Sequence, residues 1–482
     1  ALRDAFEALK DSYEDGLDPE DYHMKGMFDI VERIEELDEI KESDYKWIAK
    51  FDLLMTDAVM MYAFHLIEGK VDPYELDVNW NYGYAELPGG DGERLAKAIE
   101  AKSVSSELHK LRPDIPAYTM LKEELAHLRK IEEEGGWKSI PDGGKIDPGT
   151  TDPRIPKIKN RLKISGDLSN LADMDSQLYD DMLEEDIRFF QTRYGLTVDG
   201  VIGKGTFAAL NVPVEERIDQ VRINLERFRW VFHNIPENFI LVNIARFRAW
   251  VIRGTDIVHK TNVQVGTYYH KTPVFRSKLR YIEFNPTWTV PRSITINEIL
   301  PKLLNDHNYL KDRNMVLLDR DGNIVPFSSV NYESLSASNF PYVIRQEPGP
   351  GNALGEMKFI FPNKYSVYLH DTPSKYLFGR VSRSFSHGCI RVQNPQRLAE
   401  VLLEDTSWDK QKIKETLDSK ETTRAYFDEH IDVLLLYWTV GLFEGESVFY
   451  FPDIYKRDAM VLEKLDKEVE RISRIKFKKM DN

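Results

Sequence analysis

The hydrophobic periodicity changes along the chain, and this change limits the folds that the chain can adopt. Up to about residue 141, apolar residues recur at the three- and four-residue spacing of helices, as in Phe28, Ile30, Val31 and Ile34. From about residue 240, apolar residues instead form short runs and alternating patterns that are typical of strands, as in residues 240–244. Strands are also predicted from Tyr281 to Val290 and over residues 358–361. The pattern predicts an α+β protein of several domains, with helices first and a mainly β region later.

Length and composition predict where the chain divides into domains. A chain of 482 residues is too long for one ordinary core, so two to four domains are expected. Residues 141–156 are rich in Gly, Pro and Asp, which is typical of a linker. We predict a helical domain over residues 1–145, a small helical domain over 146–213 and a mainly β domain over 214–482. Within the last domain, residues 395–482 are predicted to add helices and a strand that pack on the β domain or on the first domain.

A second change of pattern interrupts the β region. After Pro291 the sequence turns helical to about Leu310, and a polar stretch with Gly- and Pro-rich turns follows. We interpret residues 293–352 as a helix-and-loop insertion between two strands. Insertions of this kind often cover active sites as lids, so a capping insertion is predicted.

Charge and composition exclude several classes of protein. The formal net charge of −15 argues against nucleic acid as a partner. No apolar run is long enough to cross a membrane. The chain begins at Ala1 without methionine, so any signal peptide or N-terminal membrane anchor would have been removed. A single cysteine excludes an intrachain disulfide and a Cys-rich metal site, and no metal or cofactor is predicted.

That cysteine belongs to a short segment whose residue types indicate a nucleophilic site: Ser386, His387, Gly388 and Cys389. The thiolate is the reactive form of cysteine, and a nearby imidazole is the usual way to form it near neutral pH. A lone cysteine is more often a small buried apolar residue, so its neighbours must decide. His370, which lies 19 positions earlier (389 − 370), is the predicted base for a nucleophilic Cys389.

The predicted strand over residues 365–370 gives His370 its neighbours. Side chains alternate along a strand, so Tyr368 and His370 share one face. A tetrahedral intermediate needs fixed donors for its oxyanion. The predicted donors are the backbone N–H groups of Gly388 and Cys389 and the hydroxyl of Tyr368.

Four nearby residues have alternative interpretations. His387 either lines the acyl-donor site or holds the loop by a hydrogen bond. Arg391 either forms a structural salt bridge or positions the substrate or the catalytic loop. Trp288 is either core or pocket wall, with the wall favoured. Strand alternation turns the Asp371 side chain away from His370, so the Asp371 carbonyl is the predicted partner of the imidazole. The predicted substrate-binding residues are Ser386, Arg391, Trp288, Asp371 and Asn352.

Two segments resemble known families. HDTPSKYLFGRVSRSFSHGCIRV (370–392) resembles the L,D-transpeptidase signature: a His, a 15-residue gap (371–385), Ser-His-Gly-Cys, a hydrophobic residue and Arg or Asn. FQTRYGLTVDGVIGKGTFAALN (190–211) resembles the three-helix peptidoglycan-binding domain, although a helical linker domain without sugar binding stays an alternative. NPTWTVPRSI, PGPGNALGEMKF and LLLYWTV are similar to segments of the large L,D-transpeptidases with a scaffold domain and a capping insertion.

The resemblance implies peptidoglycan cross-linking outside the cytoplasmic membrane of a bacterium. In that family the cysteine attacks a tetrapeptide stem, expels D-alanine and passes the acyl group to another stem, giving a 3→3 cross-link. The implied partners are peptidoglycan stem peptides and glycan strands, with carbapenems as inhibitors of Cys389. Water as acceptor would give an L,D-carboxypeptidase or a cross-link hydrolase. A non-catalytic wall-binding scaffold is the alternative of another class, and the complete motif argues against it.

Overall fold

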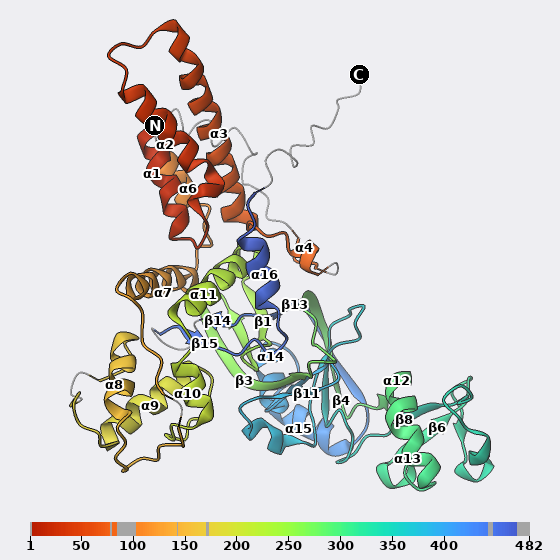
Figure 1. Ribbon diagram of the computed structural model, residues 1–482. Coiled ribbons are helices and arrows are strands. Elements are labelled where there is room, and N and C mark those ends of the chain that lie inside the picture. Colours follow the sequence, from red (N-terminus) through yellow and green to blue (C-terminus); the bar gives the residue numbers. More distant parts are fainter. Residues whose placement is uncertain are drawn as a thin grey trace, which may run out of the picture. The chain divides into compact units, whose positions relative to one another are not determined.

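The protein divides into two compact units. The structure, a computed structural model, describes residues 2–77, 80–83, 103–141, 143–169, 173–441 and 447–469. One unit comprises Ala1–Ile235 with Trp438–Asn482, and the other comprises Pro236–Tyr437. Helices dominate the first unit and strands the second, which confirms the α+β fold class (Figure 1). The domain boundaries near residues 145 and 213 stay predictions. The helical prediction over residues 84–102 lies outside the described residues.

The first unit is built from helices of very different length. Its helices and two short strands are α1 (Leu2–Lys10), α2 (Met24–Glu35), α3 (Tyr45–Glu68), α4 (Pro73–Leu76), α6 (Val104–His109), α7 (Pro116–Glu133), α8 (Ile155–Ile164), α9 (Asp181–Arg193), α10 (Lys204–Leu210), α11 (Val214–Arg229), β14 (Val440–Gly441), β15 (Phe449–Tyr450) and α16 (Asp458–Leu465). None of the described helices is long and apolar enough to cross a membrane.

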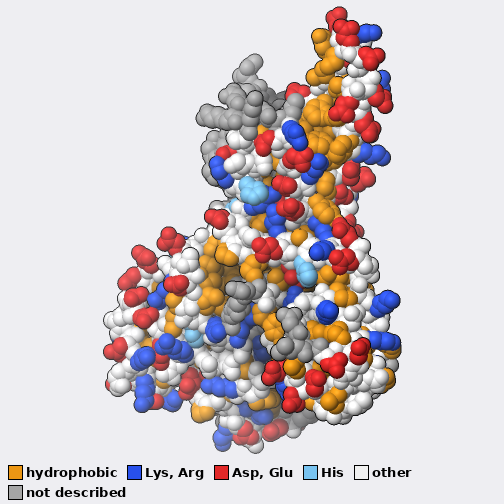
Figure 2. Space-filling view, turned by 90° about the vertical axis from the view of Figure 1, so that its left-hand side faces the viewer, with side chains coloured by type: hydrophobic (Ala, Val, Ile, Leu, Met, Phe, Trp, Pro, Cys, Tyr) orange, Lys and Arg blue, Asp and Glu red, His pale blue; other side chains and the backbone are white. Residues whose placement is uncertain are grey.

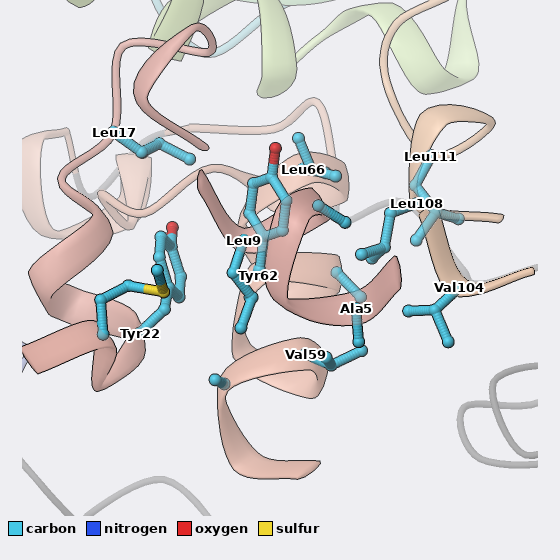
Figure 3. Packing of buried hydrophobic residues seen from close by; sticks show 14 of the residues in the cluster. Ala5, Leu9, Leu17, Tyr22, Val59, Tyr62, Leu66, Val104, Leu108 and Leu111 are labelled. Atoms are coloured by element: carbon cyan, nitrogen blue, oxygen red, sulfur yellow. The ribbon is translucent and has the colours of Figure 1, made fainter. Parts of the chain in front are cut away.

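A shared apolar cluster joins the N-terminal helices. Figure 3 shows Tyr22 and Tyr62 among its aliphatic side chains, and their ring centroids lie 5.1 Å apart. Each buried ring keeps a polar partner: Tyr62 donates to Asp15 Oδ2 at 2.7 Å, and the Tyr22 hydroxyl pairs with His65 Nδ1 at 2.9 Å. Burying the rings while satisfying their hydroxyls stabilises this core. The first unit therefore has a core of its own.

The acidic excess of the N-terminal segment lies on a helical surface. Asp29, Glu32 and Glu35 on α2 are exposed. Figure 2 shows acidic side chains among apolar ones over the α2–α3 hairpin at the top of the view. Phe28 on α2 and Leu53 on α3 are exposed. The acidic run is a solvated helix face.

Helices α8, α9 and α10 follow the periodicity of the predicted small domain. Asp180 caps α9 by accepting from the backbone N–H of Leu183 at 2.9 Å. Gly195 follows the helix with φ +62°, a left-handed conformation that glycine adopts without steric cost. Phe207 and Leu210 on α10 are buried.

The second unit is organised around one nine-stranded sheet. Its strands are β1 (Asn238–Asn243), β2 (Arg248–Arg253), β3 (Asp256–Gly266), β4 (Phe275–Phe284), β9 (Met357–Ile360), β10 (Leu369–His370), β11 (Ser384–Ser386), β12 (Ile390–Val392) and β13 (Thr423–Leu436). Their order is β11-β3-β12-β10-β9-β4-β13-β1-β2, and β3 also pairs with β2, so the pairings close into a ring. Helices α14 (Pro395–Leu402) and α15 (Lys410–Ser419) complete the unit.

The long strand β3 makes this closure possible. Its first part, up to Asn262, pairs with β2, and its last residues pair with β12 and β11. The central strands β9, β10 and β12 are short, and β10 and β12 run parallel. They lie in the middle of the sheet, where each strand pairs with a neighbouring strand on both sides and its backbone is held in place.

The predicted insertion has a fold that the sequence only partly revealed. It contains α12 (Arg292–Ile294), the π-helix η5 (Thr295–Ile299), α13 (Leu300–Asn305), β6 (Met315–Leu318), β7 (Ile324–Val325) and β8 (Val343–Gln346). The prediction of helix followed by loops was incomplete, because β5 (Trp288–Thr289), β8, β6 and β7 form a second sheet. Two- to four-residue strands inside a polar stretch give little periodic signal. This sheet and α13 share a separate apolar core.

Two predicted strands were drawn too long. The strand predicted over residues 365–370 is reduced to β10, because Ser366 is left-handed at φ +56°. Asn363 causes the turn: its side-chain oxygen accepts from the Val367 N–H at 3.1 Å, which competes with strand pairing. The strand predicted from Tyr281 to Val290 also divides, since β4 ends at Phe284 and β5 pairs with β8 instead.

Candidate active site

The backbone register of two central strands places the motif cysteine. Leu369 pairs with Ile390 and His370 with Arg391, so Cys389, one residue before β12, lies beside Tyr368. The Ile390 N–H donates to the Tyr368 carbonyl at 3.0 Å. The Tyr368 and His370 rings lie 5.6 Å apart in an edge-to-face arrangement. The register therefore sets the phenol, the imidazole and the thiol on one face of the sheet.

A tight turn holds the thiol in place. The Ser386 hydroxyl donates to the Cys389 carbonyl at 2.5 Å and accepts from the Gly388 N–H at 3.0 Å. Gly388 has φ +114°, a conformation that side chains disfavour. The Gly388 N–H, a predicted oxyanion donor, donates to the Ser386 hydroxyl in this structure, and its role toward an oxyanion stays a prediction. The Cys389 N–H has no acceptor within the described residues.

A second loop, residues 267–272, supports the turn from the side. The Thr267 N–H donates to the Ser386 carbonyl at 3.0 Å, and the Thr272 hydroxyl donates to the Gly388 carbonyl at 2.9 Å. Thr272 in turn accepts from the Gly266 N–H at 2.9 Å. Hydrogen bonds from this loop thus hold the backbone of the motif at Ser386 and at Gly388.

The thiol is half-buried and has polar neighbours. Cys389 Sγ lies 3.6 Å from the carbonyl of Ser366, the residue that breaks the predicted strand. Burial raises the pKa of the Cys389 thiol, and hydrogen bonds from Tyr368, followed by the charges of Lys358 and Arg391, oppose that rise. Burial and the neighbouring thiolate raise the pKa of Tyr368 above its usual range, so its hydroxyl stays a donor.

His370 is buried and neutral. Its Nδ1 pairs with the Asp371 carbonyl, as the alternation argument predicts. Burial, the Arg391 charge and the Lys358 charge together lower the pKa of His370 to about 3, against weaker opposing contacts with the backbone. No hydrogen bond within the described residues joins the His370 ring to Cys389 Sγ. His370 lies on β10, and Cys389 lies one residue before β12, which pairs with β10.

Arg391 makes neither a carboxylate salt bridge nor a contact with the motif turn among the described residues. Its Nη1 donates to Gln264 Oε1 at 3.2 Å, and its Nε is buried without a partner. Arg391 pairs with His370 across the strands, and its charge lowers the pKa of both the His370 imidazole and the Cys389 thiol. The geometry agrees with a positioning role for Arg391, and that role stays a prediction.

Sequence comparison identifies the unit that holds this site. Residues 237–413 match the L,D-transpeptidase catalytic domain (YkuD), and they include the whole motif. This region is an L,D-transpeptidase catalytic domain. Residues 1–125 match a scaffold domain, and residues 151–210 match a domain described as "Putative peptidoglycan binding domain". The resemblances noted in the sequence are confirmed.

Known relatives agree with this assignment. A "Putative L,D-transpeptidase" of Haemophilus influenzae is 37% identical over 250 residues, which are 51% of this chain and 50% of the relative. The chain therefore matches about half the length of that relative. Two solved L,D-transpeptidases are more distant: that of Xylanimonas cellulosilytica (14% identity, 61% of this chain, 99% of that chain, TM-score 0.18) and that of Stackebrandtia nassauensis (13%, 60%, 94%, TM-score 0.22). At such TM-scores they add nothing on the site.

The second histidine of the L,D-transpeptidase motif faces the insertion. His387 Nε2 lies 2.8 Å from Glu298 Oε1 on the π-helix, and both side chains are partly exposed. The rings of His387 and His270 lie 4.7 Å apart. His387 thus contacts the predicted cap rather than the thiol.

Three residues of the predicted substrate-binding set have structural partners. The Asp371 carboxylate accepts from the Glu356 N–H at 3.0 Å, and burial raises the pKa of Asp371. The Asn352 amide donates to backbone carbonyls of Pro286 and Glu347, both at 3.0 Å, and is buried. Trp288 packs against the core of the insertion. Their contacts with substrate stay predictions, as does that of Ser386, whose hydroxyl lies within the turn.

Several residues around the L,D-transpeptidase site escaped the sequence interpretation. They are Lys358, Ser366, Thr272, His270 and Glu298. Only Lys358 left a signal, because it alternates with buried Met357 and Phe359 on a central strand, where a charged side chain is unusual. No cluster of three or more His, Cys, Asp or Glu suited to a metal ion occurs in the described part of the chain.

Proposed function

We propose that this chain is a peptidoglycan L,D-transpeptidase that works through a Cys389 acyl-enzyme. The observation that carries the proposal is the Ser386–Cys389 turn, which presents a partly accessible thiol beside Tyr368 and on the strand face of His370. The match of residues 151–210 to a peptidoglycan-binding domain supports the same substrate class.

The first step acylates the thiol. Cys389 Sγ forms a bond to the carbonyl carbon of the third residue of a tetrapeptide stem, meso-diaminopimelate, while its proton passes to the His370 ring. The Asp371 carbonyl holds Nδ1–H, so the neutral imidazole has its other nitrogen available as an acceptor. The contact between the two groups forms when substrate binds, as catalytic hydrogen bonds often do. The Cys389 N–H and the Tyr368 hydroxyl stabilise the oxyanion.

Acylation is complete when the amide C–N bond breaks: the proton held by His370 goes to the departing nitrogen, D-alanine leaves and the thioester remains. The second step resolves the thioester. A side-chain amine of a second stem attacks its carbonyl carbon, the C–S bond breaks, and the amine proton passes by way of His370 to the sulfur, which gives a 3→3 cross-link and restores the thiol. No cofactor takes part in this proposal. A reaction on peptidoglycan takes place outside the cytoplasmic membrane.

Product analysis tests the proposal directly. The protein is incubated with disaccharide-tetrapeptide, and the products are identified by mass. A dimer with the mass of two substrates minus one D-alanine supports transpeptidation. Tripeptide alone would mean that water is the acceptor and that the chain is a carboxypeptidase. Unchanged substrate, together with retention on peptidoglycan, would favour the non-catalytic scaffold.

We also propose that residues 293–352 act as a mobile cap over the site. The support is the separate core of this insertion and the contact of its Glu298 with His387 in the motif. Hydrogen exchange tests the idea, with and without a carbapenem bound to Cys389. Exchange in the insertion should slow on acylation. Uniformly slow exchange in both states would contradict a mobile cap.

A further inference from the structure

Lys358 occupies an unusual place in the sheet. It lies on β9, pairs with His370 on β10 on one side, and pairs with Glu283 on β4 on the other. Residues in register share one face of a sheet, so the Lys358 side chain rises on the face of His370. A half-buried lysine on a central strand loses part of its hydration, and it needs a compensating partner.

No described carboxylate forms an ion pair with Lys358. Glu283 is the nearest candidate, but its Oε2 accepts from Arg424 Nε at 2.7 Å. No carboxylate oxygen of the described residues lies within the 4.0 Å of an ion pair to Lys358. Lys358 Nζ instead lies 4.2 Å from the centre of the Tyr368 ring, a cation–π contact. The ammonium group is thus held on the ring whose hydroxyl bonds the thiol.

The charges of Lys358 and Cys389 act on each other. Burial lowers the pKa of Lys358, while Glu283 and the Cys389 thiolate raise it. In return, Lys358 lowers the pKa of the Cys389 thiol against the effect of burial. His370 cannot supply this charge at rest, because its pKa of about 3 leaves it neutral. A thiolate here is therefore stabilised by the hydrogen bonds of Tyr368 and by the charges of Lys358 and Arg391.

We propose that Lys358 is a cation of the active site that stabilises the Cys389 thiolate before attack. The Tyr368 ring holds the ammonium group in place. When the thiol S–H bond breaks, the proton goes to the His370 ring, the electron pair stays on sulfur, and Lys358 keeps its own proton. Arg391, which pairs with His370 from the neighbouring strand β12, adds a second positive charge. The inference rests on the proposed function only in taking Cys389 as the nucleophile.

Thiol alkylation tests this directly, because Cys389 is the only cysteine of the chain. Iodoacetamide alkylation is followed by intact mass between pH 5 and 10, so every adduct reports on one thiol. Lys358→Met keeps the apolar stem and removes the charge. We expect the midpoint of the pH profile to rise by about one pH unit, with alkylation about tenfold slower below it, because an opposite charge nearby typically shifts a pKa by that much. Lys358→Arg should restore most of the shift.

Lys412→Met is the matched control. Lys412 Nζ lies 4.4 Å from the Trp408 ring, a similar cation–π contact on α15, and this variant should keep the wild-type profile. Thermal unfolding is measured for every variant, and Lys358→Gln replaces Lys358→Met if the latter does not fold. An unchanged midpoint in a folded, uncharged variant would overturn the inference. An unchanged midpoint with a raised KM would instead assign Lys358 to substrate binding. Alkylation needs no peptidoglycan, so a shifted midpoint stands even if the cross-linking assay fails.

Discussion

The two sides of the catalytic motif are held in different ways. On the side of the thiol, backbone pairing between β10 and β12 and the hydroxyl of Ser386 fix the chain. On the side of His387, the contact is a 2.8 Å approach of its Nε2 to Glu298 Oε1 between partly exposed side chains. Buried hydrogen bonds in a sheet persist, whereas exposed ion pairs contribute little and exchange readily. The geometry therefore pairs a rigid reactive face with a neighbouring contact that opens easily.

Removing the sulfur should have the largest effect on the rigid side. Cys389→Ala should abolish turnover and leave the fold intact, since it deletes one atom from a half-buried position. Intact-mass spectrometry with a carbapenem measures this: we expect one adduct on the wild type and none on the variant. An adduct that persists on Cys389→Ala would place the nucleophile elsewhere.

Changing the backbone conformation of the turn should lower activity less than removing the sulfur does. Gly388→Ala forces a side chain into φ +114°, although the nearest atoms, at 3.8 Å, leave room for it. The strain of about 1–2 kcal/mol should displace the thiol and lower kcat/KM about 100-fold. Gly379→Ala is the control, because Gly379 lies outside the left-handed region and has open space around it. Equal kcat/KM values for the two variants would mean that the turn tolerates a different backbone.

Removing one hydroxyl should have a smaller effect. Tyr368→Phe keeps the ring under Lys358 and deletes the donor to Cys389. A hydrogen bond to a charged group contributes about 1.5 kcal/mol or more, so kcat/KM should fall about tenfold. Tyr376→Phe, at an exposed position, should be silent. If Tyr368→Phe matched the wild type, the Cys389 N–H would have to support the oxyanion alone.

The buried imidazole should also make stability depend on pH. The pKa of His370 is lowered to about 3 in the folded state, against the usual 6.5 of an exposed imidazole. Between these values the unfolded chain binds the extra proton, so stability is present above about pH 6.5 and is lost as the pH falls toward 3. His370→Gln removes this titration, so the slope of the free energy of unfolding against pH should become smaller by up to about 1.4 kcal/mol per pH unit. Urea unfolding of both proteins, followed by a spectroscopic signal of the second unit at several pH values from 4 to 7, measures these free energies of unfolding. Parallel slopes for both proteins would show that His370 is already hydrated.

The rigid side of this comparison was largely predictable from the sequence, and the exposed side was not. The motif, the shared face of Tyr368 and His370, and the Asp371 carbonyl as partner all follow from residue identity and strand alternation. The hydrogen bond from Gly388 to Ser386, the turn at Ser366 and the contact of Glu298 with His387 depend on hydroxyl geometry and on chain segments far apart in sequence. Periodicity carries no information on such contacts. Lys358 lies between these cases, because its strand was predicted but its charge was passed over.

Breaking the ion pair at the insertion should have the smallest effect, and its size would sharpen the comparison. Glu298→Gln keeps the shape of the side chain and removes its charge, so it should change kcat/KM by no more than about threefold, as expected for an exposed pair worth at most about 1 kcal/mol. Its clearer signature should be faster hydrogen exchange in residues 295–305 with unchanged exchange in β10 and β12. Glu333→Gln, an exposed residue of the same insertion, is the control. Exchange that rises equally in the insertion and in the central strands would show that the two sides open together, and the division between a rigid reactive face and a separate cap would fail.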